Sequence, residues 1–410
     1  MIEKAEAGRI EAHLRQLARF SDGETGVTRL PFSPAARKAV AYLTKKMQDA
    51  GLKVHVDATG AVHGLRPGKN FRRIILGSHY DSVPQGGAFD GIAGVVCGLE
   101  IARLLQDKEL NYGLEIIAFN DEEGVRFGAG FLSSKALLGD LTVEDLHNCR
   151  DKEGISVYEA AKAAELTPDN LPAERWELSK IRAFLEIHIE QGGVLEYQQV
   201  PLGIVTGIVG MRRYTIEITG RADHAGTTPM DMRHDALWPA AAIIKEARRV
   251  ALACPGAVAT VGSLLMSPNA VNTVADKVEL SLDLRSMEVR EVAHMEQQIF
   301  QALAEAAEVA AVTYDIKPSL ASQPGFMDKE LISYLQTSAK KKEIKTMNMH
   351  SGAGHDALPI SAKVPTAMLF VPSKGGRSHC PEEWSNGEHL AIAVDVMLDT
   401  ILKINQEESL

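Results

Sequence analysis

Apolar positions recur with two different periods between residues 70 and 130, and these periods predict a strand, a helix and a second strand. Residues 74–76 and 114–119 are short apolar runs of the kind that form buried strands. Between them, apolar side chains over residues 91–106 recur every three or four positions, which is the spacing of one helix face. The two strands are therefore expected to be parallel, with their carboxyl ends at one sheet edge, where α/β proteins bind ligands.

The strand predicted at residues 183–190 alternates between a polar and an apolar face. Glu186, His188 and Glu190 share the polar face, while leucine and isoleucine side chains occupy the other. A fourth strand is predicted at residues 366–371, and it leads into a glycine-containing loop and then to His379. Both histidines are thus expected at the ligand-binding edge of the sheet.

Residues 209–324 have a different character and predict a second, inserted domain. The pattern indicates strands at 214–218, 257–265, 278–284 and 312–316, and helices at 236–252 and 289–307. The order β-α-β-β-α-β is typical of an antiparallel sheet with helices on one face. We therefore expect an α/β protein. Its catalytic domain, residues 1–208 and 325–410, is expected to be mainly parallel-stranded with helices on both faces, and residues 209–324 to form an inserted α+β, ferredoxin-like domain.

Composition narrows the class of protein. The chain has 410 residues, more than one hydrophobic core usually supports, and 45% of them are apolar. A net charge of −10 argues against nucleic acid as a partner. We find neither a signal peptide nor a membrane-length apolar run, so the sequence predicts a cytoplasmic protein without a membrane partner. The four cysteines are far apart, which predicts reduced thiols.

Five residues of metal-binding type follow predicted strands at separated points of the chain. They are His79, Asp90, Glu123, His188 and His379. Imidazoles with a bridging carboxylate are the donor set of dinuclear hydrolases, which also need a free carboxylate to move protons. Glu122 supplies that carboxylate, and Asp81 is placed to orient the ring of His79. The sequence predicts two divalent cations per subunit, and the donors suit zinc, manganese or cobalt.

Each of these residues also has a simpler interpretation. Asp90 precedes a predicted helix and is a candidate N-cap. Glu122 and Glu123 resemble a solvated acidic turn, and His379 resembles an ordinary loop residue. Their joint occurrence at one strand edge favours the metal site.

Six segments carry a resemblance to a known family. They are residues 77–83, 86–91, 122–127, 188–192, 351–356 and 378–384. Together they resemble the N-carbamoyl-L-amino-acid hydrolase and allantoate amidohydrolase family, within the aminoacylase-type di-zinc peptidase superfamily. Related peptidases generally carry a carboxylate where this chain has His188, so the resemblance favours ureido substrates over peptides.

The resemblance also implies the substrate side of the site. His224 matches a lid histidine that reaches the active site of the partner subunit, which implies a homodimer with residues 209–324 as lid and dimerisation domain. In the active site of the partner subunit, His224 would stabilise the oxyanion that develops on the substrate carbonyl. Gln191 and Asn272 match positions that contact substrate, and Gly352 and Gly354 would let backbone amides approach it.

A guanidinium on the polar face of the strand at 278–284 offers a further substrate contact. Arg285 is placed to hold a substrate carboxylate through two hydrogen bonds, or alternatively to form a salt bridge with Asp283. The predicted substrate is therefore a small ureido molecule that carries a carboxylate.

These expectations define an amidohydrolase that cleaves the carbamoyl C–N bond of N-carbamoyl-L-amino acids to amino acid, carbon dioxide and ammonia. Glu122 would act as general base and then as general acid. Allantoate and N-acyl amino acids are alternative substrates. A cysteine-dependent amidase that uses Cys380, and a non-catalytic metal-binding protein, are the alternative classes.

Overall fold

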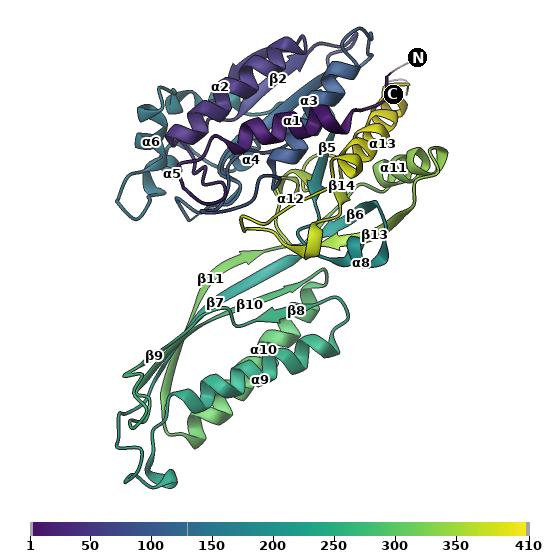
Figure 1. Cartoon of the computed structure of the whole chain (residues 1–410). Coiled ribbons are helices and arrows are strands. Elements are labelled where there is room, and N and C mark those ends of the chain that lie inside the picture. The colour runs from purple at the N-terminus through teal and green to yellow at the C-terminus, as the bar shows by residue number, and fades with distance from the viewer. Residues whose placement is uncertain (1–2, 129, 407–410) are drawn as a thin grey trace. The chain divides into compact units, whose positions relative to one another are not determined.

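The chain divides into two compact units. The computed structural model describes residues 3–128 and 130–406 and is drawn in Figure 1. The first unit comprises Met1–Thr206 with Phe326–Leu410, and the second comprises Gly207–Gly325. The boundaries drawn from the sequence, after residues 208 and 324, lie within two residues of these.

The first unit is built on a nine-stranded sheet in the order β1-β2-β4-β3-β5-β14-β6-β12, with β13 pairing β6. Its parallel centre consists of β4 (Gly113–Phe119), β3 (Arg73–His79), β5 (Ile181–Ile189) and β14 (Thr366–Val371). The flanking strands are β1 (Lys53–Val56), β2 (Val62–Arg66), β6 (Leu202–Ile208), β12 (Gly325–Phe326) and β13 (Thr346–Ser351). Because β2 and β6 pair antiparallel with the centre, the sheet is mixed, and the expectation of a mainly parallel sheet holds only for the four central strands.

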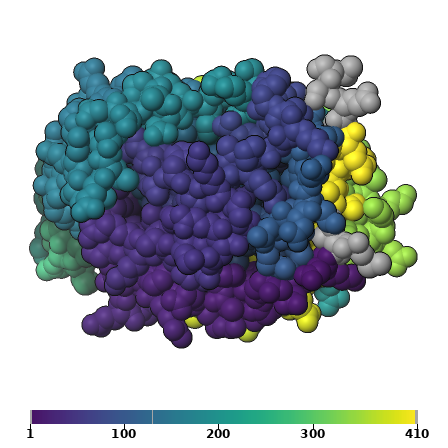
Figure 2. Space-filling view, turned by 90° about the horizontal axis from the view of Figure 1, so that it is seen from above, coloured from purple at the N-terminus to yellow at the C-terminus, as the bar shows by residue number. Residues whose placement is uncertain are grey.

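The first unit also contains helices. They are α1 (Ala7–Ala18), α2 (Pro34–Asp49), α3 (Ile92–Leu104), α4 (Leu132–Leu137), α5 (Val143–Asn148), α6 (Val157–Ala163), α7 (Leu171–Glu174), α8 (Val194–Gln198), α11 (Lys329–Lys341), α12 (Ala357–Ser361) and α13 (Gly387–Gln406). Of these, α2, α3, α11, α12 and α13 pack against the strands of this sheet. Short 3₁₀ turns are η1 (Pro168–Asn170), η2 (Leu178–Lys180) and η4 (Lys374–Gly376). Helices α1 and α13 pack together, so residues from both ends of the chain share one face of this unit (Figure 2).

The two faces of β5 have different neighbours. Leu185 and Ile187 belong to the large core that includes α3 and α13. Glu186 and His188 point to the opposite face, where α12 packs against β5 and β14. The alternation predicted from the sequence is therefore confirmed, and it places one imidazole on the polar side of the sheet.

The second unit is an antiparallel sheet with two long helices. Its strands follow the order β11-β7-β10-β8, and β9 also pairs β10. They are β7 (Gly210–Thr219), β8 (Val258–Thr260), β9 (Leu264–Ser267), β10 (Lys277–Ser286) and β11 (Thr313–Ser322). The helices are η3 (Met230–Met232), α9 (Leu237–Ala253) and α10 (Val289–Val309).

One strand of the second unit differs from the prediction. The single strand expected at residues 257–265 is two short strands, β8 and β9, separated by residues 261–263. Gly262 lies in this break, and glycine weakens a strand because it has no side chain to pack. Ser263 donates its backbone N–H to the Ser281 hydroxyl of β10, at 3.0 Å between N and Oγ.

None of the helices in residues 3–128 and 130–406 is both long enough and apolar enough to cross a membrane.

Candidate metal centre

The carboxyl ends of the four parallel strands bring four segments of the first unit together. His79 is the last residue of β3, and His188 lies at the end of β5. Glu122 and Glu123 follow β4, and His379 lies on the loop that follows β14. This is the convergence that the strand pattern predicted.

Asp90 lies between the imidazoles of this edge. Its Oδ1 atom is 3.3 Å from Nε2 of His188 and 3.9 Å from Nε2 of His79. Its Oδ2 atom is 3.1 Å from Nε2 of His379, whose Nε2 is in turn 3.4 Å from Oε1 of Glu123. One carboxylate therefore faces two sets of donors, one on each oxygen.

The donor atoms form several groups that could hold a metal ion, and two of these groups share Asp90. One is His79, Asp90 and His188, the other is Asp90, Glu123 and His379, and within each group the donor atoms lie within 4.8 Å of one another. His79 also forms such a group with Glu122 and Glu123, and His188 with Glu186 and His355. Oδ1 of Asp90 is buried and has no hydrogen-bond partner, which is rare for a buried oxygen. Imidazole nitrogens and carboxylate oxygens are the donors that zinc and similar cations prefer.

The two buried imidazoles are held so that Nε2 faces the centre. Nδ1 of His79 lies 3.1 Å from the backbone oxygen of Asp81, and Nδ1 of His188 lies 2.9 Å from that of Ile189. A carbonyl oxygen only accepts hydrogen bonds, so Nδ1 carries the hydrogen in both rings. The lone pair of Nε2 is then available to bind a cation.

The Asp81 carboxylate lies beside the ring of His79, as expected, with 3.6 Å between Oδ1 and Nδ1, and it has a second task as well. It accepts hydrogen bonds from the backbone N–H groups of Glu122 and Glu123, at 3.1 and 3.2 Å between N and O. Asp81 thus orients His79 through its main chain, and it holds the main chain of the acidic pair through its side chain.

The simpler interpretations of the acidic residues do not match the structure. The N-cap of α3 is Gly91, not Asp90, and no side chain caps this helix. Gly91 has φ of 63°, and an added Cβ would lie 2.3 Å from Nε2 of His79, so only glycine fits there. Glu122 is buried and Glu123 nearly so, which excludes a solvated turn.

Burial and neighbouring charges shift the pKa values of several groups at the centre. Although burial opposes it, the nearby Glu122 and Asp81 carboxyl groups raise the pKa of His79 well above its usual range. Burial raises the pKa of Glu122 well above its usual range, and burial together with Asp90 raises the pKa of Glu123 to about 7. Burial lowers the pKa of His188 to about 4, so this ring is neutral at pH 7 and can bind a cation. A divalent cation would offset the crowded negative charge.

Of the residues expected on the substrate side, Gln191 lies at the centre. Its Nε2 donates to Oδ2 of Asp90 at 3.0 Å and lies 3.3 Å from Nε2 of His379. Gly354 packs against Phe131, since an added Cβ would lie 2.7 Å from that ring, whereas a Cβ added at Gly352 would have no heavy atom within 4 Å.

The remaining expected residues belong to the second unit. His224 pairs with Thr273 in an isolated antiparallel bridge, which places His224 beside Asn272. Arg285 lies near the end of β10 and donates two hydrogen bonds to Asp283, of 2.7 and 3.1 Å. The salt bridge that the sequence left as an alternative is therefore present.

Two buried residues near the centre were not assigned a role from the sequence. The ring of His355 lies 4.4 Å from that of His188, and its Nε2 is 2.8 Å from the Ser351 hydroxyl. Glu383 accepts hydrogen bonds from the main chain at Asp90. Both lie in segments that carried the family resemblance, which was the available signal.

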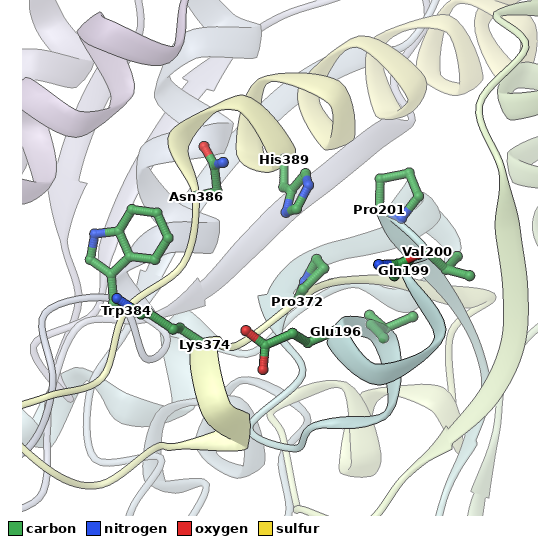
Figure 3. A pocket seen from close by; sticks show the side chains of 10 residues that line it. Glu196, Gln199, Val200, Pro201, Pro372, Lys374, Trp384, Asn386 and His389 are labelled. Atoms are coloured by element: carbon green, nitrogen blue, oxygen red, sulfur yellow. The ribbon is translucent and has the colours of Figure 1, made fainter.

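A cavity of about 470 Å³ lies beside the base of the loop that carries His379. Figure 3 shows Lys374, Pro372 and Trp384 on one side of it and Glu196 nearby. It shares no residue with the two donor groups.

Comparison with known proteins identifies the family. The sequence model of peptidase family M20/M25/M40 matches residues 75–403. The chain belongs to this family. Within it, the chain is 40% identical to N-carbamoyl-L-amino-acid amidohydrolase of Paenarthrobacter aurescens, over 97% of this chain and 98% of that protein. It is 34% identical to allantoate amidohydrolase of Escherichia coli strain K12, over 95% of each.

A solved structure of the same kind shares the fold. The amidase of the hydantoinase/carbamoylase family from Burkholderia multivorans matches with a TM-score of 0.91 at 30% identity, over 99% of each chain. This M20/M25/M40 protein is therefore an amidohydrolase, a hydrolase that acts on amide C–N bonds, with a mixed α/β fold.

Proposed function

We propose that the chain hydrolyses the carbamoyl C–N bond of N-carbamoyl-L-amino acids with two divalent cations held by the two donor groups. The observation that carries this proposal is the Asp90 carboxylate, whose two oxygens face separate sets of donors. The 40% identity to an N-carbamoyl-L-amino-acid amidohydrolase supports this substrate over allantoate, whose amidohydrolase is 34% identical.

Glu122 moves the proton in the proposed reaction. Bound cations would polarise the carbamoyl carbonyl and lower the pKa of water. Oε2 of Glu122 lies 4.0 Å from Nε2 of His79, so this carboxylate is beside the centre. The two donor groups that share Asp90 do not include it, although it also forms a group with His79 and Glu123. It takes a proton from the attacking water and returns it to the amino-acid nitrogen as the C–N bond breaks. Carbamic acid leaves and decomposes to carbon dioxide and ammonia.

A chelation and substrate experiment tests this function. We expect a chelator to abolish hydrolysis, added Zn²⁺, Mn²⁺ or Co²⁺ to restore it, and N-carbamoyl-L-amino acids to be cleaved faster than allantoate. Activity confined to N-acetyl amino acids would overturn the ureido assignment. Full activity after chelation, with loss on thiol alkylation, would favour a cysteine-dependent amidase instead.

Local hydrogen bonds orient the ring of His224 so that Nε2–H can donate a hydrogen bond. Its Nδ1 accepts from the backbone N–H groups of Gly226 and Thr227, at 3.0 and 3.2 Å, so in the neutral ring the hydrogen is on Nε2. The side chain is exposed, which leaves Nε2–H free to reach a substrate carbonyl oxygen. We propose that it stabilises the oxyanion in the site of a partner subunit.

Arg285 and Arg213 together support recognition of a substrate carboxylate. Both guanidinium groups donate to Asp283. His224 and Asn272 precede β10 in the chain, whereas Arg285 is near the end of this strand, and Lys277 and Arg285 are roughly 26 Å apart at about 3.3 Å per residue. A small ureido acid is shorter than this distance, which supports a site that combines residues from two subunits.

We further propose that the second unit dimerises through α9 and β8. Strand β8 is at the edge of its sheet. Apolar side chains are exposed beside it, with Leu252 71%, Val258 51% and Ile244 44% exposed. Apolar patches next to a free strand edge are typical of protein interfaces.

Replacing Leu252 and Val258 together by glutamate should convert the dimer to a monomer, because charges would be buried in the interface. Size-exclusion chromatography with light scattering measures the mass. Phe71→Glu, a change at an exposed residue of the first unit, is the matched control. A double variant that stays dimeric would exclude this interface.

A further inference from the structure

Glu383 links the two loops that meet at the centre. It is buried, and its Oε1 accepts hydrogen bonds from the backbone N–H groups of Phe89 and Asp90, both at 2.9 Å. Its Oε2 accepts a hydrogen bond of 2.7 Å from the hydroxyl of Ser378, the neighbour of His379. We propose that Glu383 is a positioning residue that sets the affinity of the cation on the His379 side of the centre.

The local structure is shaped around this carboxylate. An added Cβ at Gly87 would lie 2.0 Å from Oε1 of Glu383, so glycine leaves the space that the carboxylate fills. A carboxylate only accepts, and all three neighbours donate, so this buried group is satisfied. We call these three hydrogen bonds the Glu383 clamp. Oγ of Ser378 also lies 3.4 Å from Oδ2 of Asp90, so the clamp reaches the side chain of the shared carboxylate as well.

The loop that carries His379 needs such support. Its base is held by a hydrogen bond of 2.9 Å from the backbone N–H of Lys374 to the backbone oxygen of Trp384, two residues that line the cavity in Figure 3. Between these points the backbone of His379 has φ of 56°, a conformation that is costly for a residue other than glycine. Contacts with Glu383 hold this segment against the loop of Asp90.

The two donor groups are supported unequally. The side chains of His79 and His188, on central strands, are 2% and 1% exposed, whereas that of His379, on a loop, is 48% exposed. Loss of the contacts of Glu383 should therefore weaken the His379 side more than the His79 and His188 side, which depends on Glu383 only through Asp90. This inference rests on the proposed function, since it requires that cations bind.

Calorimetric titration of the metal-free protein with Zn²⁺ tests the inference. Wild type should bind two cations. Glu383→Ala should bind one cation with at most a small loss of affinity and the second about 10- to 100-fold more weakly. Glu383→Gln should restore binding, because its amide oxygen accepts both N–H groups and its amide nitrogen donates to Ser378. Glu382→Gln is the matched control, since Glu382 is exposed and pairs with Arg377.

Several outcomes would overturn the inference. Glu383→Ala that binds both cations as wild type does would show that the clamp does not set affinity. Equal loss at both sites, with a lower unfolding temperature of the metal-free protein, would show a merely structural role. Ser378→Ala, which removes one hydrogen bond, should cause a smaller shift in the same direction if Glu383→Ala fails to fold. Wild type that binds no cation would overturn the proposed function itself, a distinct result.

Discussion

Replacing Glu122 by glutamine should lower kcat by about 10²- to 10⁴-fold, the usual contribution of a general acid and base. Glutamine has nearly the same volume and keeps a hydrogen-bond acceptor, but it cannot take up a proton. Because the two donor groups that share Asp90 do not include Glu122, we expect the variant to bind as much metal as wild type. Loss of metal would assign Glu122 to the group that it forms with His79 and Glu123. Steady-state kinetics and elemental analysis of the same preparation measure both quantities.

Glu123→Gln is the matched control for that experiment. It makes the same chemical change at the adjacent residue, but it removes a carboxylate from the second donor group. We expect it to lose metal, and to lose activity for that reason. An unchanged rate in Glu122→Gln would refute its role in proton transfer, and loss of metal in that variant would make Glu122 a ligand.

The sequence predicted the strand-edge part of the site because local patterns carry that information. His188 is in a strand whose apolar side chains alternate with polar ones, so its face follows from a period of two. Glu122 and Glu123 directly follow a fully buried strand. Parallel strands end at one edge, so residues at their ends meet without further knowledge of the fold.

Asp90 was expected as a metal ligand from its residue type, but the strand pattern could not locate it. It is on a loop before α3 rather than at the end of a strand, so no periodicity locates it. Its main chain is held by Glu383, from the far end of the chain. The bridging position of Asp90 therefore depends on tertiary hydrogen bonds that only the folded structure contains.

The partners of Asp283 depend on how β10 pairs with β7. The two alternatives for Arg285, substrate contact and salt bridge, were both consistent with the polar face of the strand. In the structure, Asp283 is directly opposite Arg213 on β7, so Asp283 receives donors from two guanidinium groups. Pairing register across an antiparallel sheet is not encoded in one strand alone.

The first unit also contains a buried charge network apart from the metal centre. His63, on β2, is 3% exposed, and its Nδ1 lies 2.8 Å from Oε1 of Glu115. Its Nε2 lies 3.1 Å from Oδ2 of Asp57, which also accepts hydrogen bonds within its own turn. Arg73 forms an ion pair with the other oxygen of Glu115. Positive and negative groups thus alternate across the edge of the sheet.

This network makes stability dependent on pH with a defined sign. Burial alone would lower the pKa of His63, but its hydrogen bonds to Asp57 and Glu115 outweigh burial and raise the pKa to about 10. A raised pKa stabilises the fold fully below about 6.5, the pKa of an unfolded-state histidine, and the effect is lost as pH rises through about 10. The pKa values of Asp57 and Glu115 are lowered despite burial, chiefly by His63, so their contribution is lost at acidic pH.

His63→Leu should destabilise the protein by about 3–5 kcal/mol at pH 6, because leucine fills the space but leaves the buried Asp57 without its cation and Glu115 with Arg73 alone. Urea unfolding of the metal-free protein measures this difference, with His55→Gln as control, since His55 stacks on His63 but is exposed. The difference between variant and wild type should shrink by pH 10.5, where His63 of the wild type has lost its charge. A difference of the same size at both pH values would show that packing, rather than the charged imidazole, stabilises this edge of the sheet.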